Sequence, residues 1–191
     1  MPGDFDSHMR PTTFLRTTLI AAALILPTAL HAEPTANDIL SQARATATAQ
    51  HKNILLIFSA SWCGPCHRFD HFLTDPAISP IMNKAFGITT LDVGEHPTDT
   101  KHHDTPGAGA LRASLGGDTA GYPYILMLTP AGHTIINSLR PDSTAPAGGN
   151  IGYPAIPAEI DWFMHMLQTS APTLTPQDTA TIRAYLTAHG N

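Results

Sequence analysis

Positive charge is scarce in this sequence and does not gather anywhere along it. Lys and Arg number 10 against 15 Asp and Glu, and charged residues make up only 13% of the 191 positions. The formal net charge is -5. Proteins that bind nucleic acid or anionic lipid through electrostatics carry a basic patch or stripe. We therefore expect neither nucleic acid nor an anionic membrane surface as a partner.

The chain also lacks a hydrophobic run that would anchor it in a bilayer. The apolar stretch Leu19–Leu26 stops at Pro27, whereas a spanning helix needs about 20 apolar residues. Arginines precede this stretch and small residues follow it up to Ala32, which is typical of a secretory signal peptide over residues 9–32. Cleavage after Ala32 predicts an exported, periplasmic protein without a stable membrane anchor, in a compartment where disulfides persist.

No internal repeat divides the rest of the chain. Residues 1–8 are acidic where a signal peptide is basic, and with Met9 they resemble a cloning remnant, so they are excluded from the fold. With 42% hydrophobic residues, the chain is long enough for one domain with a proper core. We predict a single domain over residues 33–191, with an insertion at 94–121 and a helical extension at 170–191.

The only two cysteines lie in the pentapeptide Trp-Cys-Gly-Pro-Cys at positions 62–66, directly after the apolar, strand-like run Ile54–Ala60. Two thiols separated by two residues can close a small disulfide ring. If a helix begins at Cys63, its N-terminal amides and dipole stabilise a thiolate there. The pattern predicts Cys63 as the nucleophile and Cys66, more buried and one turn later, as the resolving thiol that releases a mixed disulfide.

The residues alone leave three alternatives for this motif. Cys63 to His67 also matches the attachment pattern of haem, although the upstream strand does not supply an open haem pocket. A zinc site could combine the two cysteines with His67 and His71, although structural zinc ligands usually come from separated segments. A structural disulfide without turnover is the third alternative, although structural bridges usually close longer loops.

The pentapeptide resembles the active-site signature of thioredoxins, and the resemblance extends from about Asn37 to Leu167. The resemblance implies an α/β, thioredoxin-like fold with a central mixed, mostly four-stranded sheet and helices on both faces. The residue pattern adds an extra C-terminal helix that exceeds the usual ending of the family. We predict helices over 36–50, 63–73, 75–85, 108–115, 157–168 and 175–189, and strands over 53–60, 86–93, 124–129 and 133–139. A kink is expected near Pro76.

The resemblance also assigns roles around the cysteines. Pro123 is expected to be cis beside the disulfide, with the backbone of Tyr122 presented to an extended substrate; an ordinary trans proline is the alternative. Trp62 is expected to cover the thiol pair, and Gly64 and Pro65 resemble the reducing members of the family.

Two positions depart from the thioredoxin pattern. Thioredoxins usually place a buried aspartate where this chain has Ile57, so the proton relay of the resolving thiol must differ. Tyr124 replaces a common threonine after the proline, so substrate preference is expected to differ as well. His67 could influence the thiol pair through its own titration, although a solvent-facing helical residue is the simpler interpretation.

Two segments are longer or looser than in a minimal thioredoxin. The insertion 94–121 contains three histidines before its predicted helix, and chance clustering explains them better than a metal site, so we assign none. Residues 141–157 are rich in Pro and Gly and form either a docking lip or a linker. The apolar stripe of the last helix is expected to pack back on the domain, with a dimer contact as the alternative.

These observations predict a thioredoxin-like, periplasmic thiol-disulfide oxidoreductase that reduces exported proteins through Cys63 and Cys66. It would need no cofactor other than its redox-active disulfide, and a membrane thiol carrier is expected as the electron donor. A non-catalytic chaperone or binding module on the same scaffold, and a periplasmic metal-delivery protein that uses the thiols, remain as alternatives.

Overall fold

The computed structural model describes residue 3 and residues 32–141 and 149–190 of the chain. The predicted remnant and signal peptide, apart from residues 3 and 32, lie outside the described residues. The domain is built on a mixed sheet in the order β2-β1-β3-β4, in which β1 pairs parallel with β2 and the other pairs are antiparallel. The strands are β1 (Asn53–Ser59), β2 (Phe86–Asp92), β3 (Tyr124–Leu128) and β4 (Thr134–Asn137).

The two central strands are buried on both faces, which is why their sequences are almost continuously apolar. Alternate residues of β1 point to opposite sides, so that Leu55 and Ile57 enter one core and Ile54, Leu56 and Phe58 enter the other. β3 is divided in the same way between the two cores. The register of these strands is therefore fixed, because a shift of one residue would exchange the two sets of side chains.

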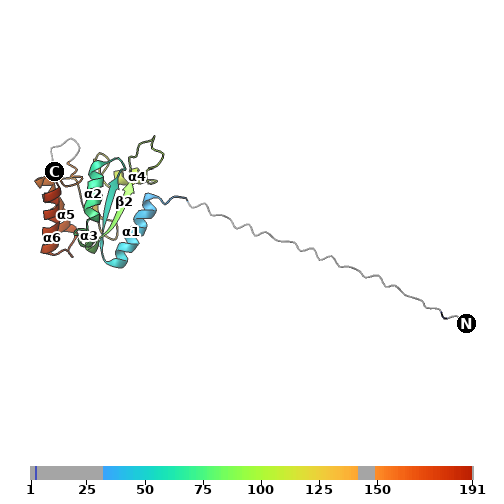
Figure 1. The fold of residues 1–191 in the computed structure, drawn as a ribbon, viewed down its shortest axis with the longest axis horizontal. Coiled ribbons are helices and arrows are strands. Elements are labelled where there is room, and N and C mark those ends of the chain that lie inside the picture. Colours follow the sequence, from blue (N-terminus) through green and yellow to red (C-terminus); the bar gives the residue numbers. More distant parts are fainter. Residues whose placement is uncertain (1–2, 4–31, 142–148, 191) are drawn as a thin grey trace. The chain divides into compact units, whose positions relative to one another are not determined.

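Helices cover both faces of this sheet, as predicted from the sequence. Figure 1 shows α1 and α4 on one side of β2, with α2, α3, α5 and α6 on the other. The helices in the described part of the chain are α1 (Ala36–Gln50), α2 (Gly64–Thr74), α3 (Ser79–Ala85), α4 (Ala108–Ser114), α5 (Pro157–Ser170) and α6 (Pro176–His189). Within the described ranges, none of them is long and apolar enough to span a bilayer.

The largest difference from the predicted helix boundaries lies between α2 and α3. The expected kink near Pro76 is a full break, because α2 ends at Thr74 and α3 begins only at Ser79. Asp75 is extended, which is the conformation that a following proline favours. Its carboxylate accepts the Ala77 N–H at 2.8 Å and so holds a turn between the two helices.

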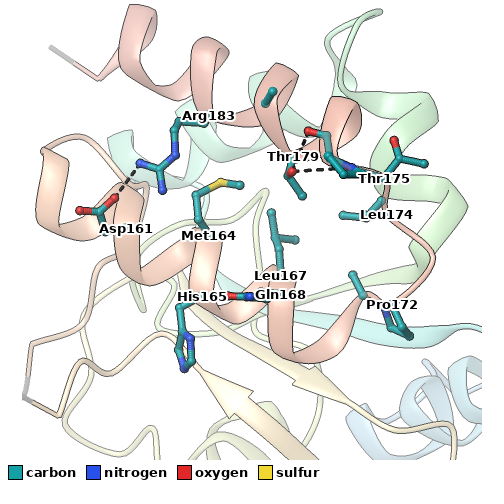
Figure 2. A pocket seen from close by; sticks show the side chains of 13 residues that line it. Asp161, Met164, His165, Leu167, Gln168, Pro172, Leu174, Thr175, Thr179 and Arg183 are labelled. Carbon is teal, nitrogen blue, oxygen red and sulfur yellow. Dashed lines mark hydrogen bonds and ion pairs between the residues drawn. The ribbon is translucent and has the colours of Figure 1, made fainter.

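The last helix packs on its own domain, as the apolar stripe predicted. Ile182 and Leu186 of α6 are fully buried in the core shared with α2 and α5, and the ring of Tyr185 lies 5.5 Å from that of Phe72. A groove of about 720 Å³ runs between α5 and α6, and Figure 2 shows Met164, Leu167 and Leu174 along it. No residue of the pentapeptide 62–66 lines this groove.

Candidate active site

The turn between β1 and α2 places both cysteines at the start of a helix. The Cys63 N–H donates to the Ala60 carbonyl at 3.1 Å and closes this turn. Cys63, where the helix was predicted to begin, is the N-cap of α2, so the helix itself starts one position later at Gly64. The Cys63 Sγ accepts the Cys66 N–H at 3.1 Å. Pro65 occupies the first helical turn, where its missing N–H costs nothing.

Cys63 and Cys66 are joined by a disulfide and both are buried, with 4% and 2% of their surface exposed. They share a small cluster with Ala60, against which the ring of Tyr122 packs. Trp62, by contrast, has 50% of its surface exposed. The disulfide is therefore shielded by Tyr122 from the side of β3, and the neighbouring surface carries an accessible indole.

The loop before β3 carries the predicted proline. The peptide bond between Tyr122 and Pro123 is cis, as the resemblance implied. The side-chain amide of Asn150 donates to the carbonyls of Gly121 at 2.9 Å and Pro123 at 3.0 Å. In the described part of the chain, no group bonds to the main-chain N–H or C=O of Tyr122.

A buried serine supports Asn150. The Ser138 hydroxyl donates to Asn150 Oδ1 at 2.6 Å and accepts the Ile125 N–H at 3.0 Å. Asn150 lies in the segment that the sequence left open as a docking lip or a linker, of which residues 149–156 are described here. Asn150 forms an antiparallel bridge with Leu139, and the neighbouring Ile151 is buried in the core. Residues 151–154 of this segment are therefore buried in the domain.

The start of the insertion holds the turn before Cys63. The Trp62 indole N–H donates to the Gly94 carbonyl at 2.8 Å, and the Glu95 carboxylate accepts both the N–H and the hydroxyl of Ser61, each at 2.6 Å. Gly94 has φ +79° and lies so close to the Tyr122 hydroxyl that a Cβ would collide with it. A glycine is required here on both counts.

The helix within the insertion contributes a cation. The Arg112 guanidinium of α4 lies 4.7 Å from the centre of the Tyr122 ring and donates to the Ala120 carbonyl and, at 3.4 Å, to the Tyr122 hydroxyl. Its buried Nε has no hydrogen-bond partner among the described residues. Tyr122 is thus held between Arg112, Gly94 and the edge contact with Trp62, whose ring centre is 5.8 Å away.

The groups near the thiol pair differ from those of the thioredoxin pattern. Ile57 is 1% exposed and lies in the apolar core, so no carboxylate occupies that position. The His67 Nε2 lies 2.8 Å from the Ser61 carbonyl. Burial raises the pKa of Asp70, four residues after Cys66 on α2, while the neighbouring His67 and His71 act in the opposite direction.

The histidines of the insertion do not converge on a common point. His102 pairs with Asp99 at 2.8 Å, while the His96 ring lies 5.4 Å from that of Trp62. Within residues 32–141 and 149–190, no three His, Cys, Asp or Glu side chains come together in a way that could hold a metal ion.

Sequence reasoning placed the cysteines, Trp62, Tyr122 and Pro123 at one site, and the structure brings all of them together there. It missed Glu95, Arg112, Ser138 and Asn150, which hold the site from outside the motif. Their only sequence signal is that they are polar residues in or near the two segments that depart from a minimal thioredoxin.

Comparison with known proteins was made for sequence and for structure. A search of curated proteins found no match. Among solved structures, a disulphide isomerase from Xylella fastidiosa Temecula1 is 20% identical, with 88% of this chain and 100% of that one covered and a TM-score of 0.47. A DsbH oxidoreductase is 17% identical, with 70% and 82% covered and a TM-score of 0.44. A thioredoxin-fold protein from Helicobacter pylori is 16% identical, with 72% and 83% covered and a TM-score of 0.40.

The match to a protein family covers the cysteine motif and the cis proline. A family described as thioredoxin-like matches residues 35–130, which include α1, β1, α2, the insertion and β3. This is about half of the chain. With its mixed sheet, its helices on both faces and its Cys63–Cys66 disulfide, the chain belongs to the thioredoxin-like family.

Proposed function

We propose that the protein is a thiol-disulfide oxidoreductase that reduces disulfides of exported proteins through the Cys63 and Cys66 couple. One observation carries the proposal: the disulfide lies at the N-terminus of α2, directly beside an unpaired Tyr122 peptide unit. A helix N-terminus stabilises a thiolate, which is the form of cysteine that attacks disulfides. The family membership supports the same chemistry.

The reaction begins from the dithiol form. The Cys63 thiolate attacks one sulfur of a substrate disulfide, a bond forms between the two sulfurs, and the other substrate sulfur leaves as a thiolate that takes a proton from water. The Cys66 thiolate then attacks Cys63 Sγ and expels the second substrate sulfur. Two electrons and two protons pass to the substrate, and the Cys63–Cys66 disulfide is restored. A dithiol donor must reduce it again.

The surface around the disulfide suits an extended polypeptide. The free N–H and C=O of Tyr122 can pair with a substrate strand in the manner of an added β-strand. Gly64 is exposed, and a Cβ added there would meet nothing within 4 Å, so there is open space beside Cys63 on this side. Gly64 therefore puts no side chain of its own in the path of a substrate backbone that approaches the Cys63 sulfur.

The direction of the reaction and its location are part of the proposal. Gly64 and Pro65 resemble the reducing members of the family, and the pattern of residues 9–32 favours export to the periplasm. Because that compartment is oxidising, a reductase there must receive electrons, and a membrane thiol carrier is the donor that the resemblance suggests.

The decisive experiment traps the mixed disulfide. In a Cys66→Ser variant, Cys63 attacks a substrate disulfide but no resolving thiol follows, so a covalent complex that is sensitive to dithiothreitol should accumulate with a disulfide substrate such as insulin. The matched Cys63→Ser variant should form none. If Cys66→Ser traps nothing, or if Cys63→Ser keeps the reductase activity, the protein is not an oxidoreductase of this kind.

The direction is measured by titrating the couple against a thiol redox buffer. The chain has two tryptophans, and Trp162 is half-buried and bonds to the Asn137 carbonyl. In a Trp162→Phe background, the fluorescence therefore comes from Trp62, which is next to Cys63 in the chain. A reversible two-electron transition with a strongly reducing midpoint supports the reductase. A markedly oxidising midpoint would instead make the protein a disulfide donor.

A further inference from the structure

The Glu95 carboxylate is bound to the turn that delivers Cys63. Its two oxygens accept the N–H and the hydroxyl of Ser61, each at 2.6 Å, and both contacts are partly buried. The Glu95 N–H in turn donates to the Asp104 carboxylate at 2.8 Å. Both ends of Glu95 are therefore fixed, and hydrogen bonds of this length to an ionised carboxylate are among the stronger ones in proteins.

The residues around Glu95 tie the same turn at further points. The Val93 N–H donates to the Ser59 carbonyl at 2.8 Å, and the Trp62 indole donates to the Gly94 carbonyl at 2.8 Å. Three consecutive residues, 93–95, thus bond to the end of β1 and to the turn that follows it. Glu95 is the member of this series that brings a formal charge.

The position of that charge matters for the thiol chemistry. The bond from the Cys63 N–H to the Ala60 carbonyl places Ser61 and Cys63 in one four-residue turn, so only Trp62 separates Cys63 from the residue to which the carboxylate is bound. A negative charge in this position disfavours a thiolate, whereas the N-terminus of α2 favours it. The field of Glu95 already acts on its neighbours: after burial, it is the largest cause that raises the pKa of Asp92.

We propose that Glu95 is a positioning residue of the dithiol site. Its negative charge, held beside Cys63 by the bonds to Ser61, disfavours the Cys63 thiolate and makes the couple more reducing. This inference rests on the proposed function. The reduced form of such a couple is stabilised by whatever stabilises its thiolate, so a nearby carboxylate shifts the equilibrium toward the disulfide and toward giving electrons away.

Other charged groups face the same region and define the background for a test. From α2, His67 contacts the Ser61 carbonyl. A cavity of about 400 Å³ beside Glu95 is also lined by charged or titratable residues of β2 and the insertion, namely Asp92, Lys101, His102 and His103. From the insertion also come Asp104, on the Glu95 N–H, and His96, beside the Trp62 ring. All of them remain in place when only Glu95 is changed.

The test replaces Glu95 with the nearly isosteric glutamine. The Glu95→Gln variant keeps an oxygen for the Ser61 N–H but loses the charge, so its equilibrium constant for oxidation by glutathione disulfide should fall about three- to tenfold, which is a rise of about 15–30 mV in reduction potential. The pH midpoint at which iodoacetamide alkylates Cys63 should fall in parallel. Asp118→Asn, which removes an exposed carboxylate from the same insertion, should change neither quantity.

A second variant separates charge from hydrogen bonding. Ser61→Ala removes one of the two bonds but leaves the carboxylate on the Ser61 N–H, so its potential should stay close to that of the wild type. The inference is overturned if Glu95→Gln has the wild-type potential, or if Ser61→Ala shifts it as much as Glu95→Gln does. Circular dichroism verifies the fold of each variant. A wild type without any reversible two-electron transition would instead refute the proposed function itself.

Discussion

Replacing Ser138 with alanine should destabilise the domain and loosen the loop that presents Tyr122. The Ser138 side chain is fully buried, and its hydroxyl is the only group among the described residues that bonds both to the Ile125 N–H, at 3.0 Å, and to the Asn150 side chain, at 2.6 Å. Asn150 in turn holds the carbonyls of Gly121 and Pro123. An alanine removes the first link of this chain without adding bulk.

The expected loss of stability follows from these two bonds. Ile125 is fully buried, so its N–H would be left unsatisfied at a cost of about 1–3 kcal/mol. The lost bond to Asn150 adds about 1 kcal/mol. The free energy of unfolding should therefore fall by about 2–4 kcal/mol, and since 1 kcal/mol corresponds to about 2–4 °C for a domain of this size, Tm should fall by about 5–15 °C.

Urea unfolding followed by circular dichroism measures this difference directly. The m-value should not change, because the same surface is exposed on unfolding. Ser114→Ala is the matched control. The Ser114 hydroxyl is exposed and, among the described residues, bonds only to the Leu111 carbonyl within α4, so stability should change by no more than about 0.5 kcal/mol. A loss below about 1 kcal/mol in Ser138→Ala would refute the reasoning from buried bonds.

Three further predictions concern charge and backbone. The pKa of Asp178 is lowered to about 2, first by its hydrogen bond to Lys84, so this bond stabilises the fold above pH 4 and is lost as the pH falls through 2. In Asp178→Asn, the Tm measured by thermal unfolding should therefore depend less on pH between 4 and 2 than in the wild type. Partial desolvation, together with the nearby Glu95, raises the pKa of Asp92, so its charged form opposes folding at neutral pH. Asp92→Asn should therefore raise Tm at pH 7 but not at pH 3, and an equal gain at both would contradict the assignment. Gly94→Ala places a Cβ against the Tyr122 hydroxyl at a positive φ and should cost about 1–3 kcal/mol in urea unfolding; a neutral result would show that the loop moves freely.

The central part of the fold was predictable because both faces of it are buried. The apolar run that becomes β1 needs no alternation when helices cover both sides, and the cysteine pair that follows has a spacing with few chemical uses. The break after α2 was harder to predict. Pro76 indicated an interruption, but the length of the turn depends on the Asp75 side chain, whose bond to the Ala77 N–H has no periodic signature.

The supports of the site could not be predicted in this way. Glu95 meets Ser61 from 34 positions away, and Asn150 meets Pro123 from 27 positions away. Such contacts arise only once the parallel pair of β1 and β2 and the antiparallel pairs of β3 have set their register. A single sequence shows polar residues in irregular segments, and nothing in their local pattern separates a buried support from a solvated loop.

The supports of the cis peptide also determine which part of the chain must be moved when the redox motif is transplanted into another protein. The family match ends at residue 130, whereas Ser138 and Asn150 come later in the chain. A fragment cut at that limit would keep both cysteines but would leave β3 with a bare edge and the carbonyls of Gly121 and Pro123 without their amide partner. Grafting experiments should therefore move the chain through α5 as one piece, since the motif depends on supports that lie beyond residue 130.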